Sequence, residues 1–185
     1  KLLPPVKEDK IELDREKIVA DMVDMVRCKT VSNRDEALVD RAEFKKFQDL
    51  LVERFSLIHK RCTLRKIGKT GLLYFLKGSS SEKPSVCMAH YDVVPVNEEG
   101  WDTPAFEGII KDGSIIGRGT LDTKGTLCGI MEALEKMLAD GYVPENDLYL
   151  SFSGEEEIDG TSCPEIVAYL EENGIGAMLV TTFGT

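Results

Sequence analysis

Apolar residues in the first third of the chain recur at the spacing of amphipathic helices. The first stripe follows Asp14, a suitable N-cap, and ends before Ser32; it consists of Ile18, Met22, Met25 and Val26. The second lies within residues 38–55 and consists of Phe44, Phe47, Leu51 and Phe55. Each stripe covers one face of a helix, so we expect both helices to pack against a hydrophobic core.

Beyond residue 60 the pattern changes to short apolar runs bounded by turn residues, which predicts strands. The runs cover residues 62–67, 72–76, 85–89, 107–110, 114–116, 147–152 and 177–181, with a loop at 78–81. The turn Lys111-Asp112-Gly113 predicts a hairpin. Helical spacing returns at residues 123–138 and 162–172. Strands that alternate with helices from residue 85 onward predict an α/β fold, in which helices cover a sheet.

Length, net charge and cysteine content restrict the classes to which this protein can belong. A chain of 185 residues suits one domain. With 33 acidic and 23 basic residues the net charge is −10, which argues against binding to nucleic acid. No apolar run approaches the roughly 20 residues of a membrane helix, so no membrane partner is expected. The five cysteines form no C-x-x-C pair and indicate free thiols, which predicts a cytoplasmic protein.

Three segments carry residues that can bind metal or transfer protons. His90 ends a predicted strand, and Asp92 follows two residues later, placed to orient His90 or another ligand. Asp122 lies in a glycine-rich segment before a predicted helix, which it would alternatively cap. Three consecutive glutamates, residues 155–157, follow another predicted strand, and a solvated acidic turn is their other interpretation. Taken singly, each segment is a weak signal.

The three segments together indicate a metal site. Functional groups in α/β sheets gather at the carboxyl ends of the strands, so we expect these segments to meet. One imidazole and several carboxylates can hold two divalent ions about 3.5–4 Å apart. Such ligands suit zinc, manganese or cobalt. A calcium module is a poorer interpretation, because the chain has no D-x-D-x-D-G loop.

Four motifs, in order, carry a resemblance to a known family. They are H-x-D-V-V-P at residues 90–95, G-W-x-x-x-P-F at 100–106, G-R-G-x-x-D-x-K-G at 117–125 and E-E-x-x-G at 156–160. The chain therefore resembles the acetylornithine deacetylase / succinyl-diaminopimelate desuccinylase family of dinuclear zinc metallopeptidases, which includes aminoacylase and carboxypeptidases. It looks most like the carboxypeptidase S and N-acyl-amino-acid hydrolase branch.

The resemblance implies the fold and its extent. We expect a three-layer, zinc-exopeptidase-like α/β fold with a mixed, mainly parallel central sheet flanked by helices. Residues 1–185 would form the N-terminal portion of the catalytic domain, with residues 1–13 as an extended arm. The family's lid domain and the C-terminal catalytic segment are expected to be absent from this chain. A homodimer is expected only in the full-length form, through that lid.

The resemblance also implies a set of metal ligands. His90 and Glu157 resemble ligands of the two zinc ions, and Asp122 resembles the carboxylate that bridges them. Asp92 resembles the carboxylate that orients His90. A cis peptide bond is implied after Asp122, before Thr123.

A general base is implied next to these ligands. Glu156 resembles the residue that takes a proton from a metal-activated water and passes it to the leaving amine. Counting along the motif with a slip of one residue would give this role to Glu155 instead. Lys124 is expected either to stabilise the acidic cluster or to face solvent, and Trp101 to anchor a loop near the site.

The chain departs from the family at the second metal. Thr182 stands where family members have Asp or Glu, and their second ligand histidine would lie beyond residue 185. His59 is not expected to replace it and is predicted to be a surface residue.

These features together predict a metal-dependent hydrolase of amide or peptide bonds. It would act as an exopeptidase or deacylase on dipeptides or N-acyl amino acids, with two Zn²⁺ ions per full-length chain and Co²⁺ or Mn²⁺ as alternatives. The other hypothesis is a truncated or degenerate, non-catalytic metal-binding or assembly module of the same fold.

Overall fold

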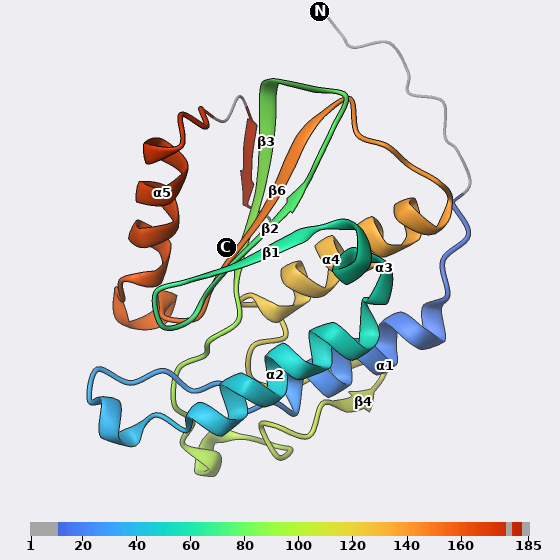
Figure 1. Cartoon of the computed structure of the whole chain (residues 1–185). Helices are drawn as coiled ribbons and strands as arrows, with labels where there is room; N and C mark the ends of the chain where they lie inside the picture. The colour runs from blue at the N-terminus through green and yellow to red at the C-terminus, as the bar shows by residue number, and fades with distance from the viewer. Residues whose placement is uncertain (1–10, 177–178, 183–185) are drawn as a thin grey trace, which may run out of the picture.

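A mixed sheet of five strands forms the centre of the molecule (Figure 1). The computed structural model describes residues 11–176 and 179–182. The strands lie in the order β1 (Thr63–Ile67), β2 (Gly71–Leu76), β6 (Asn146–Ser153), β3 (Ser80–His90) and β7 (Leu179–Thr182). Strand β3 pairs in parallel with β6 and β7, whereas β2 pairs antiparallel with β1 and β6. Of these five strands only β2 therefore runs in the opposite direction, as the expected fold class requires.

Helices cover both faces of this sheet, which gives three layers. The helices α1 (Arg15–Val26), α2 (Arg41–Arg54), α3 (Ser56–Arg61) and α4 (Lys124–Ala139) lie on one face, and α5 (Ser162–Glu172) lies on the other (Figure 1). Alternate residues of β2 supply the two cores. Leu72 and Tyr74 pack in the core beneath α1 to α4, whereas Leu73 packs in a smaller core with Ile166 of α5.

The first helix forms as predicted, but the second begins later than residue 38. Asp14 caps α1 by accepting a hydrogen bond from the main-chain N–H of Lys17. In the second helix Asp40 accepts from the N–H of Ala42 at 2.9 Å, so α2 starts at Arg41. The preceding residues form the short helix η1 (Glu36–Leu38). The apolar stripe predicted for α2 is buried as expected.

Helix α3 was not predicted, and it changes the position of His59. The main-chain N–H groups of Leu57 and Ile58 at its start donate to the carboxylate of Glu135 on α4, each at 2.9 Å. His59 is half-buried, with Nε2 3.2 Å from the hydroxyl of Tyr74. The prediction of a surface residue was wrong, because α3 places His59 against β2.

Among the remaining predicted elements, α5 and the strand at residues 114–116 have the predicted bounds, whereas others form with shifted ends. Strand β3 starts at Ser80, inside the predicted loop, and a register shift before Ser85 accommodates the extra residues. Strand β7 ends at Thr182, and its predicted first residues, 177 and 178, lie outside the described residues. The same holds for residues 1–10 of the predicted arm.

The predicted hairpin consists of β4 (Ile109–Lys111) and β5 (Ser114–Ile116), with Asp112 and Gly113 both at positive φ in its turn. The short helix η2 (Glu98–Gly100) lies in the loop before it.

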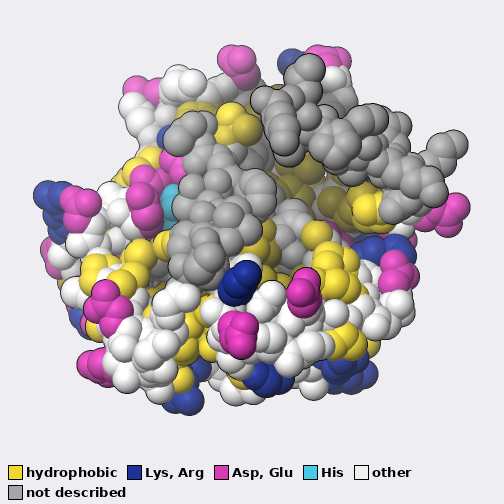
Figure 2. All heavy atoms as spheres, turned by 90° about the horizontal axis from the view of Figure 1, so that it is seen from above, with side chains coloured by type: hydrophobic (Ala, Val, Ile, Leu, Met, Phe, Trp, Pro, Cys, Tyr) yellow, Lys and Arg dark blue, Asp and Glu magenta, His cyan; other side chains and the backbone are white. Residues whose placement is uncertain are grey.

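Charged side chains of both signs are mixed on the surface. On the face shown in Figure 2, Lys and Arg side chains are interspersed with Asp and Glu and do not gather in one patch. In the described part of the chain, no helix has the length and apolar character needed to cross a bilayer.

Candidate metal centre

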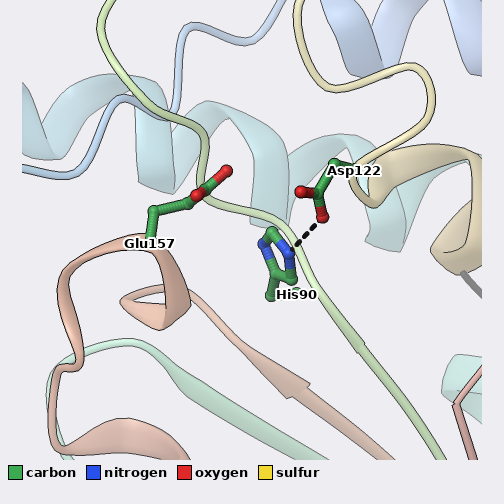
Figure 3. A group of neighbouring side chains, drawn as sticks. All are labelled: His90, Asp122 and Glu157. Atoms are coloured by element: carbon green, nitrogen blue, oxygen red, sulfur yellow. Dashed lines mark hydrogen bonds and ion pairs between the residues drawn. The ribbon is translucent and has the colours of Figure 1, made fainter. Parts of the chain in front are cut away.

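Three segments that are far apart in the sequence meet at one edge of the sheet. Strands β3 and β6 end side by side, so that His90 pairs with Ser153. The short helix η3 (Glu156–Ile158), just after β6, carries Glu157, and the turn before α4 carries Asp122. The three side chains gather in Figure 3. One ligand atom from each lies within 4.8 Å of the others, and we call this set of His90, Asp122 and Glu157 the donor group.

The ring of His90 is held on both sides. Its Nδ1 lies 3.1 Å from the main-chain oxygen of Asp92 and 3.3 Å from Oδ1 of the same residue. Its Nε2 lies 2.9 Å from Oδ1 of Asp122. A metal-binding histidine commonly keeps one ring nitrogen against a carbonyl or carboxylate, which directs the other toward the ion. In this geometry Nε2 is the nitrogen that faces the other donors.

The turn that carries Asp122 is fixed to the end of β3. The hydroxyl of Thr123 accepts from the N–H of His90 and donates to the carbonyl of His90, each at 3.0 Å. The N-cap position of α4 belongs to Thr123, and no side chain there makes a cap hydrogen bond. Asp122 therefore does not cap the helix, and its carboxylate contacts His90 instead. The peptide bond between Asp122 and Thr123 is cis, as the resemblance implies.

The buried carboxylate of Asp92 connects His90 with the glutamates of η3. Its Oδ1 accepts a hydrogen bond from the main-chain N–H of Glu156 at 3.0 Å, and its Oδ2 accepts one from Glu157 at 3.1 Å. Oδ2 also accepts from the hydroxyl of Ser32 at 2.7 Å. Asp92 thus lies against His90, where the resemblance places it, and additionally fixes the turn that follows β6.

The consecutive residues Glu155 and Glu156 lie in different surroundings. Oε2 of Glu156 lies 3.7 Å from Nε2 of His90, and 57% of this side chain is exposed. Glu155 is buried and lines a separate cavity of about 150 Å³, together with Arg34 and Arg41. Of the two candidates for the base, Glu156 is therefore the one beside the donor group.

The electrostatics of the donor group suit a cation. Burial lowers the pKa of His90, but the hydrogen bonds and charges of Asp92, Asp122 and Glu156 outweigh it and raise that pKa to about 9. Burial, and then the charge of Asp122, raises the pKa of Glu157. Carboxylates crowded in this way are stabilised by a divalent ion, and one imidazole with two carboxylates is a ligand set that Zn²⁺ accepts. The residues present therefore fit the implied metal.

Of the two predicted alternatives for Lys124, exposure to solvent is wrong, and its link to the acidic residues of the site is the charge of Asp92, which raises the pKa of Lys124 against the effect of burial. Its side chain is fully buried, and Nζ donates to the carbonyls of Met25 at 3.1 Å and Cys28 at 2.6 Å. Burial lowers its pKa to about 8. Lys124 neither faces solvent nor pairs with a carboxylate of the donor group. It joins the end of α1 to the start of α4, because its ammonium group donates to one carbonyl in the last turn of α1 and to another just after that helix.

A large open cavity adjoins the donor group. It has a volume of about 840 Å³, and Asp122, Trp101 and Arg118 all line it. The guanidinium carbon of Arg118 lies 5.4 Å from the centroid of the Trp101 ring, a cation–π arrangement. Trp101 therefore lies near the candidate centre, as expected.

Two residues considered for the second metal lie outside the donor group. His59 is in α3 and contacts Tyr74. Thr182 ends β7, where its main chain pairs with Met88, two positions before His90 in β3. The correspondence of Thr182 with an acidic ligand stays a prediction.

Comparison with known proteins decides the family. Residues 86–184, more than half of the chain, match the model of peptidase family M20/M25/M40. The chain belongs to this family. All four motifs, with His90, Asp122 and Glu157 among the residues they contain, fall within the matched region.

Curated relatives place the chain near two kinds of M20 protein. It is 40% identical over 113 residues to human N-fatty-acyl-amino acid synthase/hydrolase PM20D1, an alignment that covers 60% of this chain and 22% of the relative. It is 37% identical over 153 residues to the probable carboxypeptidase S-like 2 of Dictyostelium discoideum, covering 80% and 30% respectively. Both agree with the predicted branch. The chain spans less than a third of the length of either relative.

A solved structure supports the fold class. Human carnosine dipeptidase 1 superposes with a TM-score of 0.73 at 16% sequence identity, over 92% of this chain and 38% of that one. This similarity confirms the three-layer arrangement around a mixed sheet.

Proposed function

We propose that this chain carries the catalytic metal centre of a metal-dependent hydrolase of amide or peptide bonds. The observation that carries the proposal is the donor group, which lies at the carboxyl edge of the sheet in a chain of the M20 family. The substrate class we propose is small peptides or N-acyl amino acids, in keeping with the names of the relatives.

In this proposal each residue of the site has one task. His90, Asp122 and Glu157 hold the metal, and Asp92 keeps the ring of His90 in place. When bound, the metal lowers the pKa of a water molecule and polarises the substrate carbonyl. Glu156 lies beside the donors and reaches solvent, so it can take the proton of the attacking water and deliver it to the leaving amine.

Zn²⁺ is the metal we propose, with Co²⁺ or Mn²⁺ as alternatives. Among residues 11–176 and 179–182 one donor group of this kind is found. A second ion, as the two-metal mechanism requires, therefore needs additional donors from elsewhere in the protein.

Removal of metal tests the proposal directly. Treatment with a chelator is expected to abolish hydrolysis of an N-acyl amino acid and to lower the melting temperature, because a ligand that binds only the folded state stabilises it. Added Zn²⁺ should restore both properties. The His90→Ala variant is the control, since it removes a donor and should show no Zn²⁺-dependent rise in melting temperature. Unchanged hydrolysis after removal of all metal would refute the proposal.

The cavity beside Asp122 supports a substrate with an apolar body and a free carboxylate. Its wall is largely apolar, with contributions from Ile18, Met22, Ile115, Ile116 and Leu121. The Nε of Arg118 is buried and has no hydrogen-bond partner, and no carboxylate of the described residues lies within ion-pair distance of this arginine. A guanidinium group that has no carboxylate partner and lies on a largely apolar wall is suited to a carboxylate, which it can bind through two parallel hydrogen bonds.

Trp101 offers a direct measurement of binding in this cavity, because it is the single tryptophan of the chain. Titration with N-dodecanoylglycine is expected to change its fluorescence and to saturate. Arg118→Met should weaken this binding by about tenfold, which corresponds to the loss of one charge-assisted contact. The same variant should not affect N-dodecanoylglycinamide, which has no carboxylate. Equal weakening for both compounds would show that Arg118 does not recognise the carboxylate.

A non-catalytic module is the competing function, and the neutral Thr182 at the end of β7 is what favours it. This alternative predicts tight metal binding together with no amide hydrolysis in the complete protein. The metal-removal experiment distinguishes the two, because it measures binding and hydrolysis on the same preparation.

A further inference from the structure

A serine distant in sequence from every motif contacts the centre of the site. The hydroxyl of Ser32 donates a hydrogen bond of 2.7 Å to Oδ2 of Asp92. Ser32 is 2% exposed and Asp92 is 0% exposed, so water does not compete for this bond. A hydrogen bond to a charged acceptor in such surroundings is stronger than one on the surface.

Main-chain hydrogen bonds fix the position of Ser32. The segment 30–32 runs parallel to the residues that follow β3, and Val31 forms a parallel bridge with Val93. The N–H of Val93 donates to the carbonyl of Thr30 at 3.0 Å, and the N–H of Ser32 donates to the carbonyl of Val93 at 3.1 Å. The main chain of Ser32 is therefore held in place independently of its side-chain hydrogen bond.

The carboxylate of Asp92 contacts three groups besides the Ser32 hydroxyl. Oδ1 faces the ring of His90 and the N–H of Glu156, and Oδ2 faces the N–H of Glu157. These three groups are the His90 ring, at the end of β3, and two main-chain amides of η3, and Asp92 connects them. Ser32 is the partner that comes from outside the site, so it anchors the carboxylate to the segment 30–32, which follows α1.

We propose that Ser32 is a positioning residue of the metal centre. Its hydroxyl fixes the rotation of the Asp92 carboxylate, and through Asp92 it sets the placement of His90 and of the turn that carries Glu156 and Glu157. The inference rests on the proposed function only where metal binding is concerned. The effect on the turn does not depend on it.

The experiment compares Ser32→Ala with a matched control in the same segment. Thr30→Val also removes a buried hydroxyl, but that hydroxyl donates to the main-chain carbonyl of Tyr91 and does not contact Asp92. The first measurement is amide hydrogen exchange at Glu156 and Glu157, whose N–H groups donate to Asp92. The second is the affinity for Zn²⁺, measured by competition with a chelator.

Ser32→Ala is expected to accelerate exchange of both amides by about tenfold and to weaken Zn²⁺ binding by about tenfold, the lower end of the range for a residue that supports a metal ligand. Thr30→Val should leave both quantities at the wild-type level, even where it lowers the melting temperature to a similar degree. Ser32→Thr should restore both, since it keeps the hydroxyl and Ser32 borders the 150 Å³ cavity, which has room for a methyl group.

The inference is overturned if Ser32→Ala lowers only the melting temperature, as Thr30→Val does, and leaves amide exchange and Zn²⁺ affinity unchanged. That result would not affect the proposed function, because wild-type metal binding and hydrolysis would remain. If the wild-type protein binds no Zn²⁺, the proposed function fails. The exchange of Glu156 and Glu157 then still decides whether Ser32 positions the turn.

Discussion

Replacement of Glu156 by Gln is expected to reduce amide hydrolysis by about 100- to 10,000-fold, the usual contribution of a positioned acid–base group. Glutamine has nearly the same shape as glutamate but cannot accept the proton of the attacking water. The side chain lies beside the donor group and is not one of its members, so Zn²⁺ affinity should stay within about twofold of the wild type. The measurements are kcat/KM on an N-acyl amino acid and the metal content of the same preparation.

The neighbouring Glu155→Gln variant is the matched control. Glu155 is adjacent in sequence, but it is buried and faces the separate 150 Å³ cavity. Its replacement should leave kcat/KM close to the wild-type value. If Glu155→Gln abolishes hydrolysis and Glu156→Gln does not, the two residues have been assigned in the wrong order.

Replacement of Asp92 by Ala is expected to weaken Zn²⁺ binding by about 10- to 100-fold, because a carboxylate that supports a metal-binding histidine contributes to affinity on this scale. The same change should lower the free energy of unfolding by roughly 3 kcal/mol, since it leaves the buried hydroxyl of Ser32 and two main-chain N–H groups without their acceptor. Metal competition and denaturant unfolding measure the two effects. If the Asp92→Ala variant does not fold, Asp92→Asn, whose side chain has nearly the same volume as that of aspartate, replaces it in both measurements.

A second buried aspartate separates the effect on metal from the effect on stability. Asp147 lies near the start of β6, where it is 5% exposed, accepts a hydrogen bond from Gly78 and pairs with Lys77. Asp147→Ala should therefore destabilise the fold without changing Zn²⁺ affinity. Equal losses of metal affinity in both variants would mean that Asp92 acts only through global stability.

The donor group could be predicted from sequence because each member lies in a short local pattern. His90 follows an apolar run, Asp122 lies between closely spaced glycines, and Glu157 follows another apolar run. Each pattern identifies the end of a strand or the start of a helix, and the topology of an α/β sheet then brings such ends together. The resemblance added the separate roles of the residues, which spacing alone does not distinguish.

The residues that support the donor group could not be predicted in this way. Ser32 and Asp92 are 60 positions apart, and Lys124 bonds to the carbonyl of Cys28 across 96 positions. The sequence around a serine or a lysine does not indicate which distant residue its side chain will contact. Helix α3 was missed for the same reason, because the carboxylate that caps it comes from Glu135, 77 positions from Ile58.

The spacing of the donor group along the chain has a consequence for folding. His90 and Asp122 are 32 residues apart, and Glu157 follows after a further loop of similar length. In the unfolded chain an ion held by all three would close both loops at once, at an entropic cost that grows only slowly with loop length. Once the protein is folded, the proposed ion would act as a removable cross-link between β3, the turn before α4, and η3. The supply of metal during synthesis is therefore expected to influence how much protein reaches the folded state.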